Sequence, residues 1–316
     1  RTQAEYQAAH IPGAIFTDYA KDGWRVNVRG VAGQLPPLAD LERLIGRLGV
    51  DNDTHVVLVP LGERATDMGT ATRIYWTFKV VGHDKVSILD GGFSDWSKID
   101  PKTKQRVYQL ATGGTQPQPK TFKGNLRQEM LVTAADVQKA IANNVPLVDN
   151  RPNDFHLGIS LSPAATRAGT IPGAKNIQES FITRNGGGSF RSAAQLRQIF
   201  AAVGVPTEGE QISFCNTGHW ASLGWFAAHE LMGNKQAKMY DGSMAEWSRD
   251  KGLPLSIWPR DIAQFEIFSR DPHSSGFTAG HRAERRAGGP VFCRLEAISR
   301  ADRRKTILSG GRARCH

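Results

Sequence analysis

The feature that most constrains the fold is a plan that occurs twice in the chain. His-Ile-Pro-Gly-Ala at residues 10–14 returns 160 residues later as Thr-Ile-Pro-Gly-Ala at residues 170–174. Asp-Gly-Gly-Phe-Ser-Asp-Trp at residues 90–96 returns 151 residues later as Asp-Gly-Ser-Met-Ala-Glu-Trp at residues 241–247. This spacing is far longer than the period of a solenoid repeat, so it indicates a duplicated domain.

Between these landmarks each copy carries an apolar strand, a helix and a second strand. We expect them at residues 55–59, 70–81 and 85–89 in the first copy, and at residues 211–214, 221–232 and 237–240 in the second. Short apolar strands that alternate with amphipathic helices indicate parallel α/β layers. The second copy also has a helix N-cap at Thr133 and a buried opening strand at residues 146–149.

The sequence predicts a first domain at residues 1–111 and a Gly- and Pro-rich linker at 112–132. A second domain follows at 133–260, and then a basic tail at 261–316. The first domain has no counterpart of the opening strand of the second. Since the chain starts at Arg1 rather than Met, we expect this strand to be missing and a sheet edge to be left unpaired. The tail shows no sustained period, so we expect disorder with a short helix near residues 295–303.

Charge and composition argue against several classes of function. The net charge is +10, but the tail supplies half of it. The rest of the chain has no basic stripe with interleaved aromatic residues, which a nucleic-acid groove would need, so we expect no nucleic-acid partner. No apolar run approaches the ~20 residues that span a bilayer, so we expect no membrane partner. The three cysteines do not form a disulfide framework, and their number is compatible with cytoplasm or periplasm. No metal-ligand spacing or dinucleotide fingerprint is present, so we predict neither a metal nor a cofactor.

Cys215 lies where a predicted strand ends and a predicted helix begins. We expect the strand at residues 211–214, a loop at 215–220 and the helix from Ala221 onward. Backbone N–H groups of such a loop, together with a helix N-terminus, favour a thiolate and would hold a persulfide equally well. The alternative is a small apolar residue that merely ends a core strand.

Together these motifs resemble the tandem rhodaneses, which are thiosulfate and 3-mercaptopyruvate sulfurtransferases. The resemblance covers residues 1–258 and includes Leu-Val-Asp-Asn-Arg at residues 147–151. It implies an α/β fold of two rhodanese-like domains, each a parallel five-stranded sheet flanked by helices. It also implies a non-catalytic first domain, and here Val-Pro-Leu at residues 59–61 stands in place of Phe-Cys-Asn at 214–216. A related phosphatase would need Arg six positions after the cysteine, where this chain has Ala221.

The resemblance implies a sulfurtransferase in which Cys215 takes a sulfane sulfur from a donor and carries it as a persulfide. The donor would be thiosulfate, 3-mercaptopyruvate or a persulfide, and the acceptor cyanide, a small thiol or thioredoxin. We expect the chain to act as a monomer. The alternative is a non-enzymatic sulfur carrier or binding protein with little turnover of small donors. The loop residues expected to cradle the persulfide are Asn216, Thr217, Gly218, His219, Trp220 and Ala221.

The loop after Cys215 matches neither pattern of the family it resembles. Thiosulfate-type members follow the cysteine with Arg and Lys, and mercaptopyruvate-type members follow it with Gly and Ser and end the loop in Val-Thr. Phe155 stands where members carry an anion-binding Arg. The best remaining cations are Arg184 and Arg191, which flank a glycine-rich loop and would hold a carboxylate or sulfonate; the alternative is that both are solvated.

Two aromatic residues of the loop have open roles. His219 either supplies a charge or proton near neutral pH, or only shapes the pocket. Trp220 either walls the pocket against a larger donor or packs against the other domain. In contrast, Asp149 and Arg151 are expected to form a structural pair at a strand–loop junction.

Overall fold

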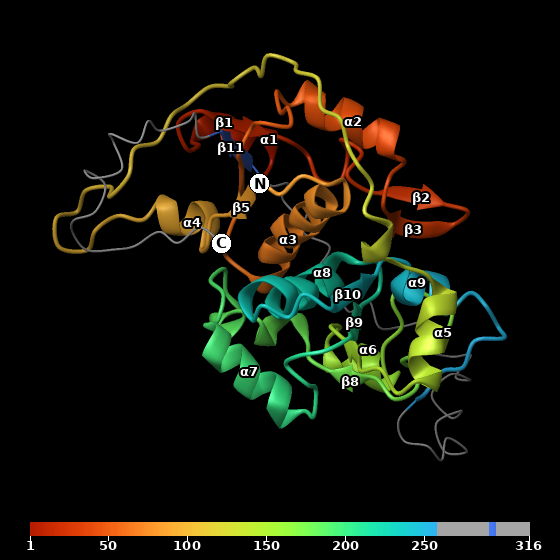
Figure 1. The fold of residues 1–316 in the computed structure, drawn as a ribbon. Coiled ribbons are helices and arrows are strands. Elements are labelled where there is room, and N and C mark those ends of the chain that lie inside the picture. Colours follow the sequence, from red (N-terminus) through yellow and green to blue (C-terminus); the bar gives the residue numbers. More distant parts are fainter. Residues whose placement is uncertain (258–290, 295–316) are drawn as a thin grey trace, which may run out of the picture.

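The computed structural model describes residues 1–257 and 291–294, which form two α/β units joined by a long segment (Figure 1). The second unit contains a five-stranded sheet in the order β6-β10-β9-β7-β8, and every neighbouring pair is parallel. Its strands are β6 (Leu131–Val132), β7 (Leu147–Asp149), β8 (Lys175–Asn176), β9 (Gln211–Phe214) and β10 (Ala237–Tyr240). All residues of β7 and β9 are buried, as central strands covered on both faces require.

Helices flank this sheet and follow the predicted order. They are α5 (Ala134–Ala142), α6 (Asn153–Leu157), α7 (Ala193–Ala202), α8 (His219–Phe226) and α9 (Ser243–Trp247), with short 3-10 turns η2 (Glu179–Phe181) and η3 (Arg184–Gly186). Thr133 and Asp136 form a reciprocal capping box at the start of α5, which confirms the predicted N-cap. Helix α8 continues into a short π-helix, η4 (Ala227–Leu231).

The first unit repeats the plan with one departure. Its sheet has the order β1-β11-β4-β5 among the described residues, with strands β1 (Ala14–Phe16), β4 (Val56–Val59), β5 (Val86–Ile88) and β11 (Val291–Arg294). Its helices are α1 (Gln3–Ala8), α2 (Leu38–Arg47), α3 (Ala65–Val80) and α4 (Gly92–Trp96), and a hairpin, β2 (Val26–Val28) and β3 (Val31–Gln34), extends from it.

The described part of the first sheet departs from the expected plan in two respects. The five parallel strands occur in the second unit, whereas the described part of the first sheet has four. The place that β7 holds in the second sheet is not left unpaired, because β11 lies between β1 and β4. β11 is antiparallel to both neighbours, and an antiparallel ladder satisfies their backbone groups as a parallel strand would. The rest of the tail, including the helix expected near residues 295–303, lies outside the described residues.

The linking segment packs closely on the first unit. Phe122 is buried, Lys120 N donates to Gly46 O at 2.9 Å, and Arg127 N donates to Val80 O at 2.8 Å. A 3-10 turn, η1 (Gln128–Met130), then leads into β6. Because β6 pairs with β10, the second sheet begins two residues before the predicted domain boundary.

The two units meet along α3 and α8, which lie side by side at the centre of the molecule (Figure 1). Thr72 Oγ1 lies 2.9 Å from Ser222 Oγ, and the Tyr75 and Phe226 rings meet edge to face at 5.0 Å. The largest hydrophobic cluster contains residues of both units, so the interface is a continuous core.

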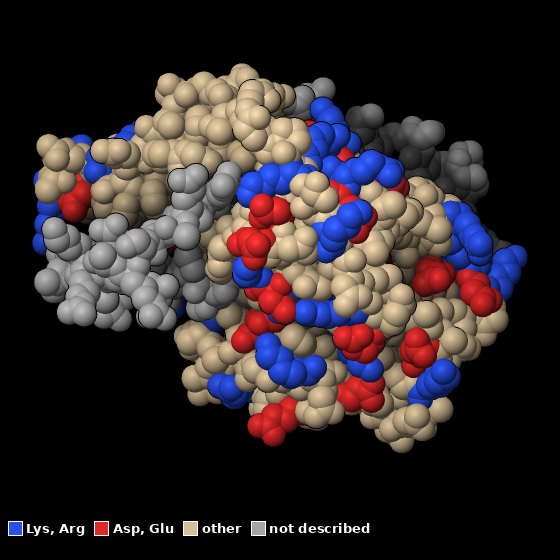
Figure 2. Space-filling model, turned by 45° about the horizontal axis from the view of Figure 1, so that its top comes forward, with Lys and Arg blue, Asp and Glu red and all other residues tan. Residues whose placement is uncertain are grey.

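One face of the molecule shows how its charged side chains are arranged. On the face shown in Figure 2, Lys and Arg are interspersed with Asp and Glu and form no continuous basic stripe. Within residues 1–257 and 291–294, no helix is both long and apolar enough to cross a membrane.

Candidate functional site

Cys215 directly follows β9 and is almost completely enclosed, with 1% of its surface exposed. Its backbone is tied to the turn that starts α9. Cys215 N donates to Ser243 Oγ at 3.1 Å, and Cys215 O accepts from Met244 N at 3.0 Å. The next carbonyl, of Asn216, accepts from Ala245 N at 2.9 Å. The first two carbonyl groups of the loop are therefore engaged by α9.

The N–H groups of the same loop remain open. Helix α8 begins at His219, two residues earlier than predicted, after Gly218 with φ 76° and ψ −8°. This left-handed conformation suits glycine, which has no Cβ. In the described part of the chain, none of the backbone N–H groups from Asn216 to Ala221 has a protein acceptor. These groups and the positive end of α8 lie beside Cys215 and form a site for an anion.

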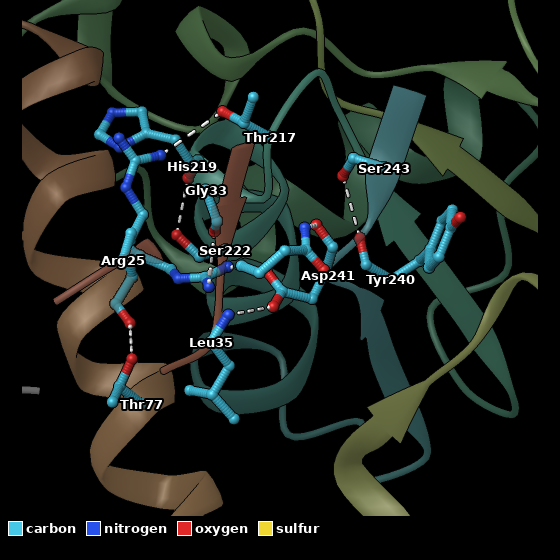
Figure 3. A network of polar contacts seen from close by, with 12 residues as sticks. Arg25, Gly33, Leu35, Thr77, Thr217, His219, Ser222, Tyr240, Asp241 and Ser243 are labelled. Atoms are coloured by element: carbon cyan, nitrogen blue, oxygen red, sulfur yellow. Dashed lines mark hydrogen bonds and ion pairs between the residues drawn. The ribbon is translucent and has the colours of Figure 1, made fainter. Parts of the chain in front are cut away.

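Residues of the first unit cover this loop. Tyr19 Oη lies 3.1 Å from His219 Nδ1, and Arg25 Nη1 donates to Thr217 Oγ1 at 3.4 Å. Figure 3 shows Arg25 reaching across to Thr217. Gly33, with φ 84°, lies so close to the loop that a Cβ there would be 2.8 Å from Thr217 O. The site is thus assembled from both halves of the chain.

A buried ion pair lies beneath the loop and joins the two units. Arg73, on α3, is fully buried and pairs with Asp241, which follows β10. Leu35 N donates to Asp241 Oδ2 at 2.7 Å, and Arg73 Nη2 donates to Gly33 O at 3.1 Å. Burial alone would lower the pKa of Arg73, but the Asp241 carboxylate more than offsets it, so the pKa is raised. Asp241 is therefore a link between units.

His219 is held in one neutral form. Its Nε2 lies 3.0 Å from Thr66 O, a carbonyl that can only accept, so Nε2 carries the proton and Nδ1 accepts from Tyr19. Burial lowers the pKa of His219 to about 3, and the nearby Arg25 and Arg73 charges act in the same direction. This favours the pocket-shaping role over a proton donor near neutral pH.

Trp220 also contacts the first unit. Its Nε1 donates to Thr66 Oγ1 at 3.4 Å, and its ring lies 6.5 Å from the Phe155 ring. The contact with Thr66 is the interdomain packing that the sequence left open as one alternative. Phe155, on α6, brings an apolar ring to this neighbourhood instead of a cation.

Neither of the two arginines predicted to bind substrate contacts the Cys215 loop in the described structure. Arg184 is exposed, and Arg191 Nε donates to Phe181 O at 2.9 Å within the same segment. The glycine-rich loop between them packs on the first unit, where Gly91 N donates to Gly188 O at 3.1 Å. Among the described residues, no hydrogen bond or ion pair joins either arginine to the Cys215 loop.

The structural pair predicted near the start of the second domain is present. Arg151 donates to both carboxylate oxygens of Asp149, at 2.9 and 2.6 Å, and both residues are buried. Thr170 Oγ1 and His156 Nδ1 contact the same carboxylate at 2.8 and 3.0 Å. The pair therefore fixes the junction after β7, as predicted.

Sequence reasoning missed the three residues that the first unit contributes near the cysteine: Tyr19, Arg25 and Arg73. None lies in a motif, and their proximity to the loop depends on contacts between residues far apart in the chain. The structure also shows no group of three or more His, Cys, Asp or Glu side chains within the described residues that could hold a metal.

The duplicated α/β units, with one enclosed cysteine loop at their junction, define the class of protein. The model of the rhodanese-like domain matches residues 1–99 and 133–250. A putative thiosulfate sulfurtransferase of Haloferax volcanii is 33% identical over 255 residues, which are 79% of this chain and 84% of that protein. The thiosulfate sulfurtransferase of Rattus norvegicus is 32% identical over 255 residues, or 79% and 80% of the two chains.

A solved structure supports the fold alone. The anaerobic ergothioneine biosynthesis enzyme of Chlorobium limicola matches with a TM-score of 0.67 at 21% identity. The match covers 81% of this chain and 62% of that one, so this chain spans less than two thirds of the solved structure. With the domain model and the sequence relatives, the conclusion is direct: the chain belongs to the rhodanese family of sulfurtransferases, with two rhodanese-like domains in tandem.

Proposed function

We propose that this sulfurtransferase moves a sulfane sulfur from a small donor to a thiophilic acceptor through a persulfide on Cys215. The observation that carries the proposal is the set of backbone N–H groups from Asn216 to Ala221, which have no acceptor among residues 1–257 and 291–294 and lie beside an enclosed cysteine. A persulfide has the same charge as a thiolate, one atom further out, so the same N–H groups stabilise both.

The donor half of the reaction balances without a cofactor. The Cys215 thiolate attacks the outer sulfur of thiosulfate, a new S–S bond forms, and the old S–S bond breaks with its electron pair leaving on sulfite. With 3-mercaptopyruvate the C–S bond breaks instead, and the proton of the donor thiol ends on the methyl group of pyruvate. An acceptor such as cyanide then attacks the outer sulfur and leaves as thiocyanate, which regenerates the thiolate.

The enclosure of Cys215 supports a second candidate. With 1% of the residue exposed, a donor reaches the sulfur only through a narrow opening or a movement of the covering residues. A carrier that holds a persulfide and exchanges it slowly would fit that enclosure. The two candidates differ in turnover and not in the modified residue.

Intact mass spectrometry tests the proposal. The wild-type protein and Cys215→Ser are each exposed to thiosulfate or 3-mercaptopyruvate, and then to cyanide. We expect a gain of one sulfur that Cys215→Ser lacks, and its release as thiocyanate over many cycles. Loading without repeated release would favour the carrier, and equal loading of both proteins would contradict a role for Cys215.

A further inference from the structure

The Cys215 loop lacks a side chain that could neutralise an anionic donor. Thiosulfate carries two negative charges and 3-mercaptopyruvate a carboxylate, and each approaches a thiolate that repels it. The described loop from Cys215 to Trp220 contains no Lys or Arg. Within the described residues Arg191 donates to Phe181 O, and the exposed Arg184 has no contact with the loop. Backbone N–H groups stabilise the sulfur, but the far end of the donor still needs a cation.

Arg25 lies at the place where that cation is needed. Its Nη1 reaches Thr217, two residues after the cysteine, at 3.4 Å. Its guanidinium carbon lies 4.6 Å from the centre of the Tyr19 ring. Tyr19 in turn lies 3.1 Å from His219 Nδ1; burial raises the pKa of Tyr19, and a charge on Cys215 acts in the same direction. The cation is therefore held over the loop by an aromatic face.

Arg25 also has unused binding capacity. A guanidinium has five N–H donors, and within the described residues Arg25 has no ion pair with a carboxylate. Its Nε is buried and has no hydrogen-bond partner there. Arg73, a fully buried cation nearby, is neutralised by Asp241. A buried, unpaired donor on a charged group is costly, and an anionic ligand would satisfy it.

Given the persulfide chemistry proposed above, we infer that Arg25 of the first domain binds the carboxylate or sulfonate end of the sulfur donor. The donor would lie with its outer sulfur toward Cys215 and its anionic end between the guanidinium and the Thr217 hydroxyl. The first domain then supplies the specificity for anionic donors, although it carries no nucleophile.

The test compares donors with and without a second anionic group. Sulfur loading of Cys215 is measured by intact mass for wild type, Arg25→Gln and Arg25→Lys. The donors are thiosulfate, 3-mercaptopyruvate and 2-hydroxyethyl hydropersulfide, whose remnant, 2-mercaptoethanol, has neither carboxylate nor sulfonate. We expect Arg25→Gln to lower kcat/KM about 10- to 100-fold for the two anionic donors, mainly through KM. Arg25→Lys should recover part of the loss, and the hydropersulfide should load all three proteins at similar rates.

Arg29→Gln is the matched control, because Arg29 is exposed on the adjacent hairpin and its loss changes the net charge equally. It should behave as wild type. The inference is overturned if Arg25→Gln uses thiosulfate as well as wild type does, or if it loses activity equally with all donors. Failure of the wild-type protein to load Cys215 from any donor would instead overturn the proposed function.

Discussion

Two strand–helix junctions, β4 to α3 and β9 to α8, have the same architecture, but the N–H groups at their helix N-termini are satisfied differently. Where β4 leads into α3, the third helical residue is Asp67, whose carboxylate accepts from Glu63 N and Arg64 N, both at 3.0 Å. Where β9 leads into α8, the third helical residue is Ala221, and the loop N–H groups have no acceptor among the described residues. The first junction is closed by the protein's own anion. The described residues supply no such anion at the second junction, where the function proposed above would place the charge of the sulfur.

Each junction is covered by the other half of the chain. A Cβ on Gly188 would collide with Gly62 O, and one on Gly33 would lie 2.8 Å from Thr217 O. The turns that follow β5 and β10 accept equivalent bonds: Asp90 from Phe190 N at 2.8 Å, and Asp241 from Leu35 N at 2.7 Å. Each unit therefore contributes a similar segment that packs over the junction of the other unit. Only the segment from the first unit, which includes Gly33 and Leu35, lies over a cysteine.

Converting the open junction into the closed type should have the largest effect. In Ala221→Asp, the new carboxylate would accept the loop N–H groups and repel both the thiolate and an anionic donor. We expect sulfur loading of Cys215, measured by intact mass, to slow by about 10²- to 10³-fold. Because Ala221 is fully buried, the added volume should lower the melting temperature, and by a similar amount in Ala221→Asn.

Ala221→Asn controls for size, since it adds the same volume without the charge and should lose much less activity. Asp67→Ala is the reverse change at the first junction. It should cost about 1 kcal/mol of unfolding free energy and leave sulfur loading unchanged. If Ala221→Asp loads sulfur as fast as wild type, the contrast between the two junctions has no catalytic meaning.

The ion pair between Arg73 and Asp241 tests whether the first copy is needed to hold the second. Arg73→Met leaves a nearly buried carboxylate without its partner, which should lower the unfolding free energy by about 3–5 kcal/mol in urea titrations. Adding Asp241→Asn should recover part of the loss. Arg43→Met is the matched control, because Arg43 pairs with Asp40 at the exposed surface and should change stability by less than about 1 kcal/mol. Equal effects for the two arginines would contradict a linking role.

The sequence predicted the elements that depend on local pattern. Strands β9 and β10 have the predicted bounds, because each is a short apolar run between turn residues. The start of α8 was placed two residues late, because His219 and Trp220 resemble loop residues while the left-handed Gly218 already caps the helix. Helix α3 begins five residues before its predicted start. Its first turn contains the polar residues Thr66 and Asp67, which interrupt the apolar pattern, and the Asp67 carboxylate caps the turn.

What the sequence did not predict depends on contacts between distant segments. Arg25 reaches Thr217 across 192 positions, and Arg73 reaches Asp241 across 168. No periodicity or motif encodes such contacts, because they follow from how the two units pack. For the same reason the strand β11, from the tail, was not expected within the first sheet.

A last comparison concerns Tyr19 and Glu179, which occupy equivalent positions, 160 residues apart, in the first and second units. Burial raises the pKa of Glu179 to about 7, and its Oε2 is buried without a hydrogen-bond partner in the described structure. Since this folded-state pKa lies above the unfolded one, the protonated carboxyl stabilises the fold below about pH 4.5, and that contribution is lost as the pH rises through 7.

We therefore expect Glu179→Gln to reduce the fall in unfolding free energy between pH 5 and 8 by about 2 kcal/mol, after allowance for partial solvent exposure. Glu208→Gln, at an exposed position, should follow the wild-type profile. If the unfolding free energy of wild type and Glu179→Gln changes with pH in the same way, then Glu179, like Tyr19 in the first unit, does not titrate near neutral pH.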